Sequence, residues 1–436
     1  MEDVLEDILA KVSKQVDHAE IYAESGESVN VDILNGKVNH ANEESIKGIG
    51  IRVINNQKQG FAYTTNMDNI DQIIQQAITN SKLNEEDENI TLIQGGNKYP
   101  TVKGLYDKKL ENFQLQEAIE FSKHMIELAE EKKCNPSAGL FTVGIEKSTL
   151  LNTNGVNVTH ESTSCCAEIE VNVEDNDAVS SAYYYDISHE NNMDAQFIVD
   201  KATTLALASR NAQPTHTRDT QVVLDFQASL SLLQTFFSAL SSENKQRGRS
   251  QFKDKLNQQV ISDKINLTDD GRIDGALCSS IADGEGSPSQ KTPLIENGVL
   301  KNFIYDTYHA NKDEANVETT SNAVRSGYNS VPTVGFTNLK LDFDEVTPIE
   351  ELTEAITVNN VMGAHTANPI TGDFSVEVMN AFEIRNGERR HPIKKAMISG
   401  NIFEIMKSAT AATKDTRQLG SLITPKILVK SLRVIA

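Results

Sequence analysis

The amino-acid sequence predicts an α+β protein. Its N-terminal half is expected to contain two similar units of helices and antiparallel sheet, and its C-terminal half a β-rich, barrel-like domain. Three observations lead to this prediction: four Asn-Gly pairs divide the chain, one order of elements occurs twice, and the chain becomes mostly β beyond residue 218. The expected segments are a first unit at 1–95, a second unit at 105–212 and the β-rich domain at 218–436.

The composition is typical of a globular protein and limits the partners it can bind. The 436 residues suffice for two or three domains, and 38% of them are hydrophobic. The formal net charge of −21 argues against nucleic-acid binding, because nucleic-acid binders need clustered Lys and Arg. The short basic segment 244–255, NKQRGRSQFKDK, is interpreted as a solvated loop.

The N-terminus lacks the pattern of a signal peptide. Residues 1–16 are acidic, with apolar side chains at helical spacing, and they predict an amphipathic helix. No apolar run is long enough to cross a bilayer, so no membrane association is expected. Four cysteines without a secretion signal indicate reduced thiols and a cytoplasmic location.

Each Asn-Gly pair predicts a β-hairpin. The pairs lie at 35–36, 154–155, 297–298 and 386–387, and alternating or apolar residues flank each of them. Asn-Gly favours the positive φ angles of a two-residue hairpin turn. Four such turns make antiparallel sheet the dominant architecture.

The first two hairpins belong to an internal repeat of helix, hairpin, two alternating strands and helix. Besides its hairpin, the first unit is predicted to contain a helix at 3–17, strands at 49–53 and 60–64, and a helix at about 68–82. The second unit is predicted to contain a helix at about 114–133, strands at 166–173 and 180–186, and a helix with Phe197, Ile198, Ala202 and Leu205. The similarity of NGKVNHANEES to NGVNVTHESTS supports a duplication.

Two breaks separate these units from each other and from the C-terminal half. The acidic segment 83–104, with Gly and Pro, is predicted to be a linker, and a second break falls at 209–219. Beyond it the chain predicts one strand and helix, then mostly strands, with further helices near 349–356 and 401–409.

The segment THESTSCCAE at 159–168 contains a His-Glu pair and two cysteines, all of which can bind metals. Apolar and polar residues alternate after it, which predicts a strand with Cys165 on the buried face and Cys166 on the other face beside Glu168 and Glu170. Adjacent strand residues point apart, His160 lies on the preceding segment, and no C-x-x-C or H-x-x-x-H spacing occurs. The segment is therefore interpreted as a core strand and not as a metal site.

Other local motifs do not indicate chemistry when each is taken alone. The glycine-rich segment ADGEGSPSQ at 282–290 has no following helix or lysine, so it does not match a phosphate-binding loop. It is expected to connect into the third hairpin. No serine lies in a G-x-S-x-G motif.

Three longer segments taken together are more informative. They are residues 35–64, 283–312 and 365–401, and the last contains an N-P-x-T-G-D-F core at 368–374 followed by a hairpin and an S-G-N turn. Along nearly the whole chain, and in the expected order, these segments resemble the TldD/PmbA family, long labelled modulators of DNA gyrase. The N-P-x-T-G-D-F core is the most specific part of the resemblance.

The resemblance implies a relation to zinc metallopeptidases that degrade unstructured peptides, including leader peptides and antitoxins. Catalytic members hold zinc with two histidines of a His-Glu-x-x-x-His motif on a helix and with a cysteine near the C-terminus. Here the motif positions fall at Gln234, Thr235 and Ala239, and no cysteine follows Cys278. These residues offer neither the zinc ligands nor the catalytic base, so the chain resembles the metal-free PmbA/TldE branch.

The resemblance therefore implies the non-catalytic subunit of a cytoplasmic peptidase system. The expected partner is a TldD-like, metal-bearing paralogue that forms a heterodimer with this chain and carries the zinc, while no cofactor is expected in this chain. The alternative is a homodimeric protein that binds peptides without proteolysis. The sequence leaves open whether the chain has enzymatic activity of its own.

The N-P-x-T-G-D-F core allows a structural and a functional interpretation. Its residue types are typical of a turn that leads into a strand. Alternatively, Asn368, Thr371 and Asp373 lie beside a peptide groove and hydrogen-bond an extended backbone there.

Overall fold

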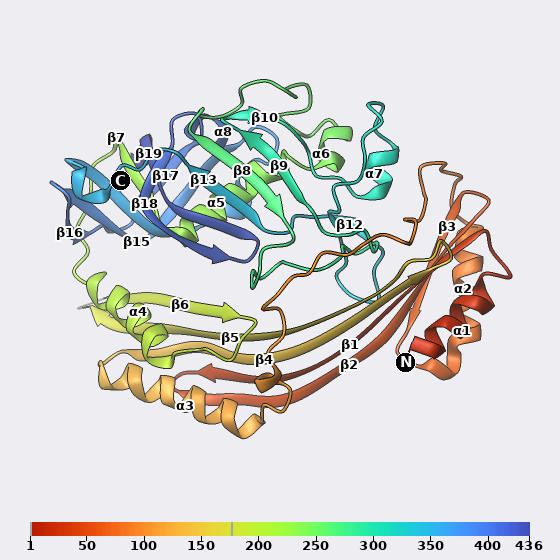
Figure 1. The fold of residues 1–436 in the computed structure, drawn as a ribbon. Helices are drawn as coiled ribbons and strands as arrows, with labels where there is room; N and C mark the ends of the chain where they lie inside the picture. The colour runs from red at the N-terminus through yellow and green to blue at the C-terminus, as the bar shows by residue number, and fades with distance from the viewer. Residues whose placement is uncertain (1, 176–177) are drawn as a thin grey trace.

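Six antiparallel strands form one curved sheet in the N-terminal half of the chain (Figure 1). The computed structural model describes residues 2–175 and 178–436. The strands pair in the order β3-β2-β1-β4-β5-β6. Their bounds are β1 (His18–Leu34), β2 (Lys37–Asn55), β3 (Lys58–Thr64), β4 (Asn135–Asn152), β5 (Asn157–Asp175) and β6 (Ala178–Ser188).

Four helices cover one face of this sheet. They are α1 (Glu2–Val12), α2 (Ile70–Ser81), α3 (Leu115–Glu131) and α4 (Ala195–Ala208). Side chains alternate between the two faces of a strand, and odd-numbered residues of β1 point towards the helices. Ala19, Ile21 and Ala23 pack with α1 and α2, whereas Val31 and Ile33 pack with α3 and α4. One sheet thus supports two separate cores.

The prediction of two similar helix and sheet units is confirmed, and the structure adds that the units share a single sheet. Their first strands, β1 and β4, pair antiparallel from Glu20 opposite Asn152 to Leu34 opposite Ala138. The strand order β3-β2-β1 of the first unit is therefore mirrored as β4-β5-β6 in the second. Pairing of equivalent strands in opposite directions gives the two units an approximate two-fold relation.

Three of the four Asn-Gly pairs form the predicted two-residue turns. At 35–36, 297–298 and 386–387 all six residues have φ between 47° and 77°, and the turns join β1 to β2, β9 to β10 and β15 to β16. The pair at 154–155 lies in a four-residue connection between β4 and β5, where Gly155 has φ 88°. Asn152 shapes this connection by accepting the N–H groups of Asn154 and Val156.

The segment predicted to be a linker is held between the sheet and the C-terminal domain (Figure 1). Residues 82–107 are all described and contain no helix or strand. The Asn152 side chain donates to the Ile93 carbonyl at 2.9 Å, and the Tyr99 hydroxyl donates to the Gly286 carbonyl at 3.1 Å. The linker is therefore anchored on both sides.

The C-terminal half is dominated by strands. They are β7 (Arg218–Leu224), β8 (Ile265–Asp270), β9 (Lys291–Glu296), β10 (Val299–Leu300), β11 (Ala323–Val324), β12 (Thr333–Val334), β13 (Leu339–Phe343), β14 (Glu354–Met362), β15 (Asp373–Arg385), β16 (Glu388–Pro392), β17 (Met397–Asn401), β18 (Thr410–Leu419) and β19 (Leu422–Ile435). The helices are α5 (Phe226–Ser238), α6 (Ser242–Gln246), α7 (Thr307–Asn311) and α8 (Ile402–Ile405). Across the described residues, no helix combines the length and the apolar character needed to span a membrane.

Five of these strands close into a barrel, as the sequence predicted for this domain. The strands β19, β17, β15, β14 and β7 pair in succession, and β7 pairs again with β19. Helix α5 contacts β14 and β19. Its Leu232, Leu233 and Phe236 are buried in the largest core of the protein.

The predicted helix near 349–356 is wrong. Residues Ile349–Glu351 form only a 3-10 turn, and β14 begins at Glu354. Ile356 and Val358 are β-branched and buried between β7 and β15, where strand pairing overrides the local helical pattern. The helix near 401–409 is present as the shorter α8, capped by the Asn401 side chain.

The strand interpretation of THESTSCCAE is confirmed. Cys165 is 0% exposed and packs with Ala167 and Ile169 in the core beneath α3 and α4, whereas Cys166 is half-buried on the opposite face. Burial raises the pKa of the Cys165 thiol to about 12 and that of Cys166 to about 11. Both thiols are therefore protonated at neutral pH.

We expect Cys165→Ser to lower the free energy of unfolding by roughly 1–3 kcal/mol, because a serine hydroxyl would be buried without a partner. Cys166→Ser is the matched control and should cost less, since that side chain is half-buried. Urea denaturation measures both changes. In the native protein a thiol reagent should modify Cys166 before Cys165, as read by mass spectrometry of digests. Equal labelling of both thiols would contradict the strand register.

Candidate functional site between the two halves of the chain

The face of the sheet opposite the helices points towards the C-terminal domain, and cross-strand pairing arranges its side chains in rows. Glu24 of β1 lies opposite Gly48 of β2 and Ser148 of β4, and Ser148 lies opposite His160 of β5. This polar row is two residues away from an apolar row formed by Tyr22, Leu150 and Val158. The two rows form the floor of a cavity.

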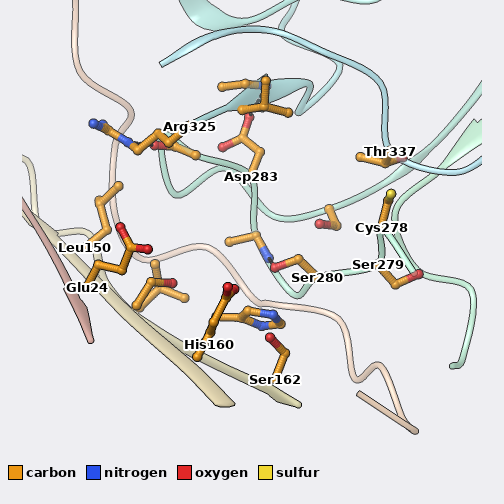
Figure 2. A pocket seen from close by; sticks show the side chains of 18 of the residues that line it. Glu24, Leu150, His160, Ser162, Cys278, Ser279, Ser280, Asp283, Arg325 and Thr337 are labelled. Carbon is orange, nitrogen blue, oxygen red and sulfur yellow. Dashed lines mark hydrogen bonds between the residues drawn. The ribbon is translucent and has the colours of Figure 1, made fainter. Parts of the chain in front are cut away.

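Loops of the C-terminal domain lie over these rows, and together they line a partly open cavity of about 420 Å³. In Figure 2, Glu24, Leu150, His160 and Ser162 come from the sheet, while Cys278, Ser280, Asp283 and Arg325 face them from the loops. A volume of this size is within the range of about 300–1,000 Å³ that is typical of small-molecule sites. The cavity is lined by both halves of the chain, and ligand sites occur preferentially at such domain interfaces, so it is a candidate site.

A buried cluster of charged side chains joins the two halves beside this cavity. Arg52 of β2 donates from Nε to Glu20 Oε1 at 3.0 Å and from Nη2 to Glu20 Oε2 at 2.8 Å. Arg325 of the C-terminal domain donates from Nη2 to the same carboxylate. Arg52 Nη1 also lies 3.8 Å from Glu285 Oε1. All four side chains are almost completely buried.

Arg325 is fixed by more than its contact with Glu20. Its Nε donates to the Gly284 carbonyl at 2.6 Å, and its Nη1 donates to the Ser330 carbonyl at 3.0 Å. The guanidinium lies over the Tyr22 ring, 4.8 Å from the ring centroid. The geometry leaves Arg325 little freedom to turn into the cavity and bind a ligand.

Two glycines of β2 allow the C-terminal domain to approach the sheet. A Cβ atom at Gly48 would lie 2.3 Å from the Tyr328 ring, and one at Gly50 would lie 2.2 Å from the Tyr328 carbonyl oxygen. The Tyr328 amide in turn donates to Glu24 Oε2 at 2.7 Å. Any larger residue at either glycine would push this loop away from the cavity.

The pKa values of the carboxyl groups in and beside this cluster shift in opposite directions. Burial opposes ionisation of Glu20, but Arg325 and Arg52 outweigh burial and lower its pKa. For Asp283, burial and the nearby Glu285 raise the pKa to about 7, although its Oδ1 accepts the N–H groups of Glu285 and Ser287. Burial also raises the pKa of Glu285 against the attraction of Arg52.

The two histidines and the cysteine thiol that line the cavity do not form the Cys-His pair of a nucleophilic catalyst. His189 is fixed by the Thr163 carbonyl at 2.6 Å from Nδ1 and by the Ala276 carbonyl at 3.3 Å from Nε2. Burial and the neighbouring His189 lower the pKa of His160. Burial and Asp269 raise the pKa of the Cys278 thiol, which keeps it in the unreactive protonated form.

The positions aligned with the zinc motif lie on α5 and just after it. Gln234 is exposed, Thr235 is half-buried, and Ala239 is the buried C-cap residue of the helix. Ala239 offers no ligand atom and Gln234 is a poor zinc ligand, so this donor set does not fit zinc. Across the described ranges, no three His, Cys, Asp or Glu side chains are grouped to hold a metal ion.

The segment where the resemblance places a cysteine ligand performs another role in this chain. Arg417 of β18 donates from Nη2 to the Tyr185 carbonyl, and its guanidinium lies 4.3 Å from the centroid of the Tyr184 ring. The Gln418 side chain donates to Asn338 Oδ1 at 2.9 Å. These side chains join β18 to the edge strand β6 of the sheet and to a neighbouring loop.

The structure brings Asn368, Thr371 and Asp373 together in one turn, but none of them lines the interdomain cavity. Asn368 Oδ1 accepts the N–H groups of Ile370 and Thr371, and the Thr371 hydroxyl donates to Asp373 at 2.8 Å. Asn401 donates to the same carboxylate, and these bonds lower the pKa of Asp373. Such contacts fit the structural interpretation, and the peptide-groove role stays a prediction.

Sequence reasoning missed Glu20, Arg52, Asp283, Glu285 and Arg325. The segment around Asp283 was expected to be only a connection. The available signal was two acidic residues in a glycine-rich segment that also belongs to the family resemblance. The charges of Glu20 and Arg52, inside the otherwise apolar stretches 19–23 and 49–54, gave a second signal.

Family profiles match most of the chain. The PmbA/TldA metallopeptidase C-terminal domain matches residues 217–436, and domain 1 and the central domain match 19–81 and 108–210. The curved sheet with its barrel domain is thus a metallopeptidase-related architecture. The chain belongs to the PmbA/TldD family, as its sequence segments predicted.

Individual relatives cover the chain almost completely. The uncharacterized protein MJ0231 of Methanocaldococcus jannaschii is 34% identical over 428 residues, or 98% of each chain. Metalloprotease MJ0996 of the same organism is 26% identical and covers 93% of this chain and 92% of its own length.

Solved structures agree with this fold. TldE from Thermococcus kodakarensis has a TM-score of 0.92 at 25% identity, covering 99% of this chain and 100% of its own. A Thermotoga maritima protein named as a candidate modulator of a DNA gyrase has a TM-score of 0.90 at 22% identity, covering 99% of both chains. The second likeness concerns the fold alone.

We expect Glu20→Gln to lower the free energy of unfolding by about 3–5 kcal/mol, because two buried guanidinium groups would lose their shared counter-charge. Glu161→Gln is the matched control, since Glu161 forms an exposed pair with Lys147 worth about 0–1 kcal/mol. Chemical denaturation of both variants measures the difference. Equal effects of the two substitutions would show that the buried cluster does not stabilise the fold.

Asp283 should make the folded state less stable as pH rises from about 4 to about 7. Its pKa is 3.8 in the ordinary environment and about 7 here, so the folded protein binds the extra proton in this window. The contribution of Asp283 to the free energy of unfolding is complete below about pH 4 and is lost as pH approaches 7. Asp283→Asn removes the titration, so the variant should lose less thermal stability than wild type across this window.

Thermal unfolding at a series of pH values tests this expectation. Asp415→Asn is the control, because Asp415 is exposed and its variant should follow the wild-type profile. A profile of Asp283→Asn that is parallel to wild type would refute the role of this carboxyl.

Proposed function

We propose that this chain is the metal-free, non-catalytic subunit of a two-subunit peptidase system. A second family member, of the TldD type and with an intact His-Glu-x-x-x-His motif, would carry the zinc and cleave the peptide. One observation supports this most. Helix α5 is complete and packs in the barrel core, but the side chains at the motif positions, Gln234, Thr235 and Ala239, provide neither zinc ligands nor a catalytic base. The scaffold is retained without its catalytic groups.

Preservation of the whole fold indicates a retained use for its surface. A relative that is 34% identical covers 98% of the chain, so the similarity extends over the whole scaffold. Pairing with a catalytic relative is the simplest use, in a pseudo-symmetric dimer with an interface of upwards of about 2,000 Å². The proposed substrates are unstructured peptides, such as leader peptides and antitoxins, because the cavity proposed between the two subunits would admit an extended peptide and exclude a folded protein.

We also propose a cytoplasmic location, on the ground that all four cysteines are free thiols. A second candidate function is a homodimer that binds peptides without cutting them. The interdomain cavity favours this alternative, because a single chain forms it without any partner.

Purified alone, the chain should contain no stoichiometric zinc and should cleave unfolded peptides no faster than background, because its motif positions cannot bind the metal. Mixed with a zinc-bearing family member from the same genome, it should form a heterodimer that cleaves peptides. Elemental analysis and size-exclusion chromatography with light scattering measure both outcomes.

The matched control is the same mixture with the catalytic Glu of the partner replaced by Gln, which should associate without cleavage. A homodimer that binds peptides and does not associate with the zinc-bearing relative would favour the second function. About one zinc per chain, lost with chelator together with activity, would refute the non-catalytic assignment.

A further inference from the structure

The interdomain cavity contains polar groups that the protein itself leaves without partners. Within the described ranges, the side chains of His160, Ser162 and, at the exposed rim, Glu146 make no hydrogen bond or ion pair. The Ser289 side chain also lines the cavity, is only 6% exposed and has no such partner among those residues. Among the described residues these polar atoms are not sealed from the cavity, so solvent or a bound molecule can supply their missing partners.

The charges on the cavity wall show which kind of molecule would be stabilised. Both basic side chains of the wall are already paired, Arg325 with Glu20 and Lys147 with Glu161 at 2.6 Å. Glu24 uses only Oε2, which accepts the Tyr328 amide, and Glu146 is unpaired. Glu24, Glu146 and the buried Asp283, which accepts only backbone N–H groups, thus line the wall without a positive partner among the described residues, and a cation would supply it.

The spacing of these carboxylates favours an ammonium group over a metal ion. Glu24 lies opposite Ser148 and Gly26 lies opposite Glu146, so the two acids are diagonal neighbours about 7–8 Å apart, with their Cβ atoms somewhat closer. An ammonium group has three donors and can bridge two such acceptors. A calcium ion would need about six or more oxygen ligands, and no group of three candidate ligands occurs among the described residues.

We propose that this cavity is a binding site for a primary ammonium group carried by a compact organic molecule. Glu24 and Glu146 would hold the charge, and His160, which burial favours in its neutral form, would accept a further N–H. The apolar row of Tyr22, Leu150 and Val158 would contact the carbon chain next to the nitrogen. This inference concerns the isolated chain and does not depend on a peptidase partner.

Isothermal titration calorimetry of the full chain at neutral pH and low salt tests the site. One arm uses 1,4-diaminobutane, a second uses trialanine, and a third uses N-acetyl-trialanine. Saturable binding of one molecule per chain is expected for the diamine, for trialanine, or for both, and not for the acetylated peptide. The first two arms distinguish a free amine from a peptide N-terminus as the source of the ammonium group.

Glu146→Gln keeps the shape of the rim and should weaken binding about tenfold or more, because a charged hydrogen bond is lost. Glu24→Gln should do the same, while Glu44→Gln, which removes an exposed charge elsewhere on β2, should change affinity less than twofold. Thermal unfolding of each variant verifies that it is folded. No saturable binding of either free amine by wild type would overturn the proposal, as would equal effects of Glu146→Gln and Glu44→Gln. Neither result would bear on association with a zinc-bearing relative.

Discussion

The carboxylate of Glu20 lies between the guanidinium groups of Arg52 and Arg325, and the arrangement of the two halves of the chain depends on this contact. Removing three charges from water is expensive, and their attraction compensates only when geometry and hydrogen bonding are nearly complete. Here Arg52 binds both carboxylate oxygens, and Arg325 also satisfies two backbone carbonyls. The cluster therefore tolerates few relative positions of sheet and barrel.

The cavity is a consequence of that restriction. Glycines at 48 and 50 let the loop with Tyr328 approach β2, and Glu24 and Tyr22 of β1 contact the same region through the Tyr328 amide and the Arg325 guanidinium. The cavity opens beyond these contacts, over the rows of β4 and β5. The position and shape of this cavity follow from the contacts around it. The positions aligned with the zinc motif lie elsewhere, on α5 and just after it, where Gln234 is exposed, Thr235 is half-buried and only Ala239 belongs to the barrel core.

Local patterns predicted those parts of the structure that depend on local chemistry. Alternation placed Cys165 inside and Cys166 outside, and Asn-Gly predicted three turns correctly, because both signals act over a few residues. The strand at 354–362 was missed because its partners, β7 and β15, decide its conformation. The buried charged cluster was missed for the same reason, since Glu20 and Arg325 are brought together only by the complete fold.

The pairing of β1 with β4 also determines the order in which the protein can fold during synthesis. Residues joined across these strands are between 104 and 132 positions apart, from Leu34 with Ala138 to Glu20 with Asn152. Contacts at such separation form slowly, because a long loop must close before any of them is made. When the first unit has left the ribosome, one edge of β1 stays unpaired until β4 emerges. The backbone amides and carbonyls of that edge can meanwhile pair with other chains. Pairing of the two units through β1 and β4 makes one larger sheet, and it creates an interval during which nascent chains are exposed to misassociation.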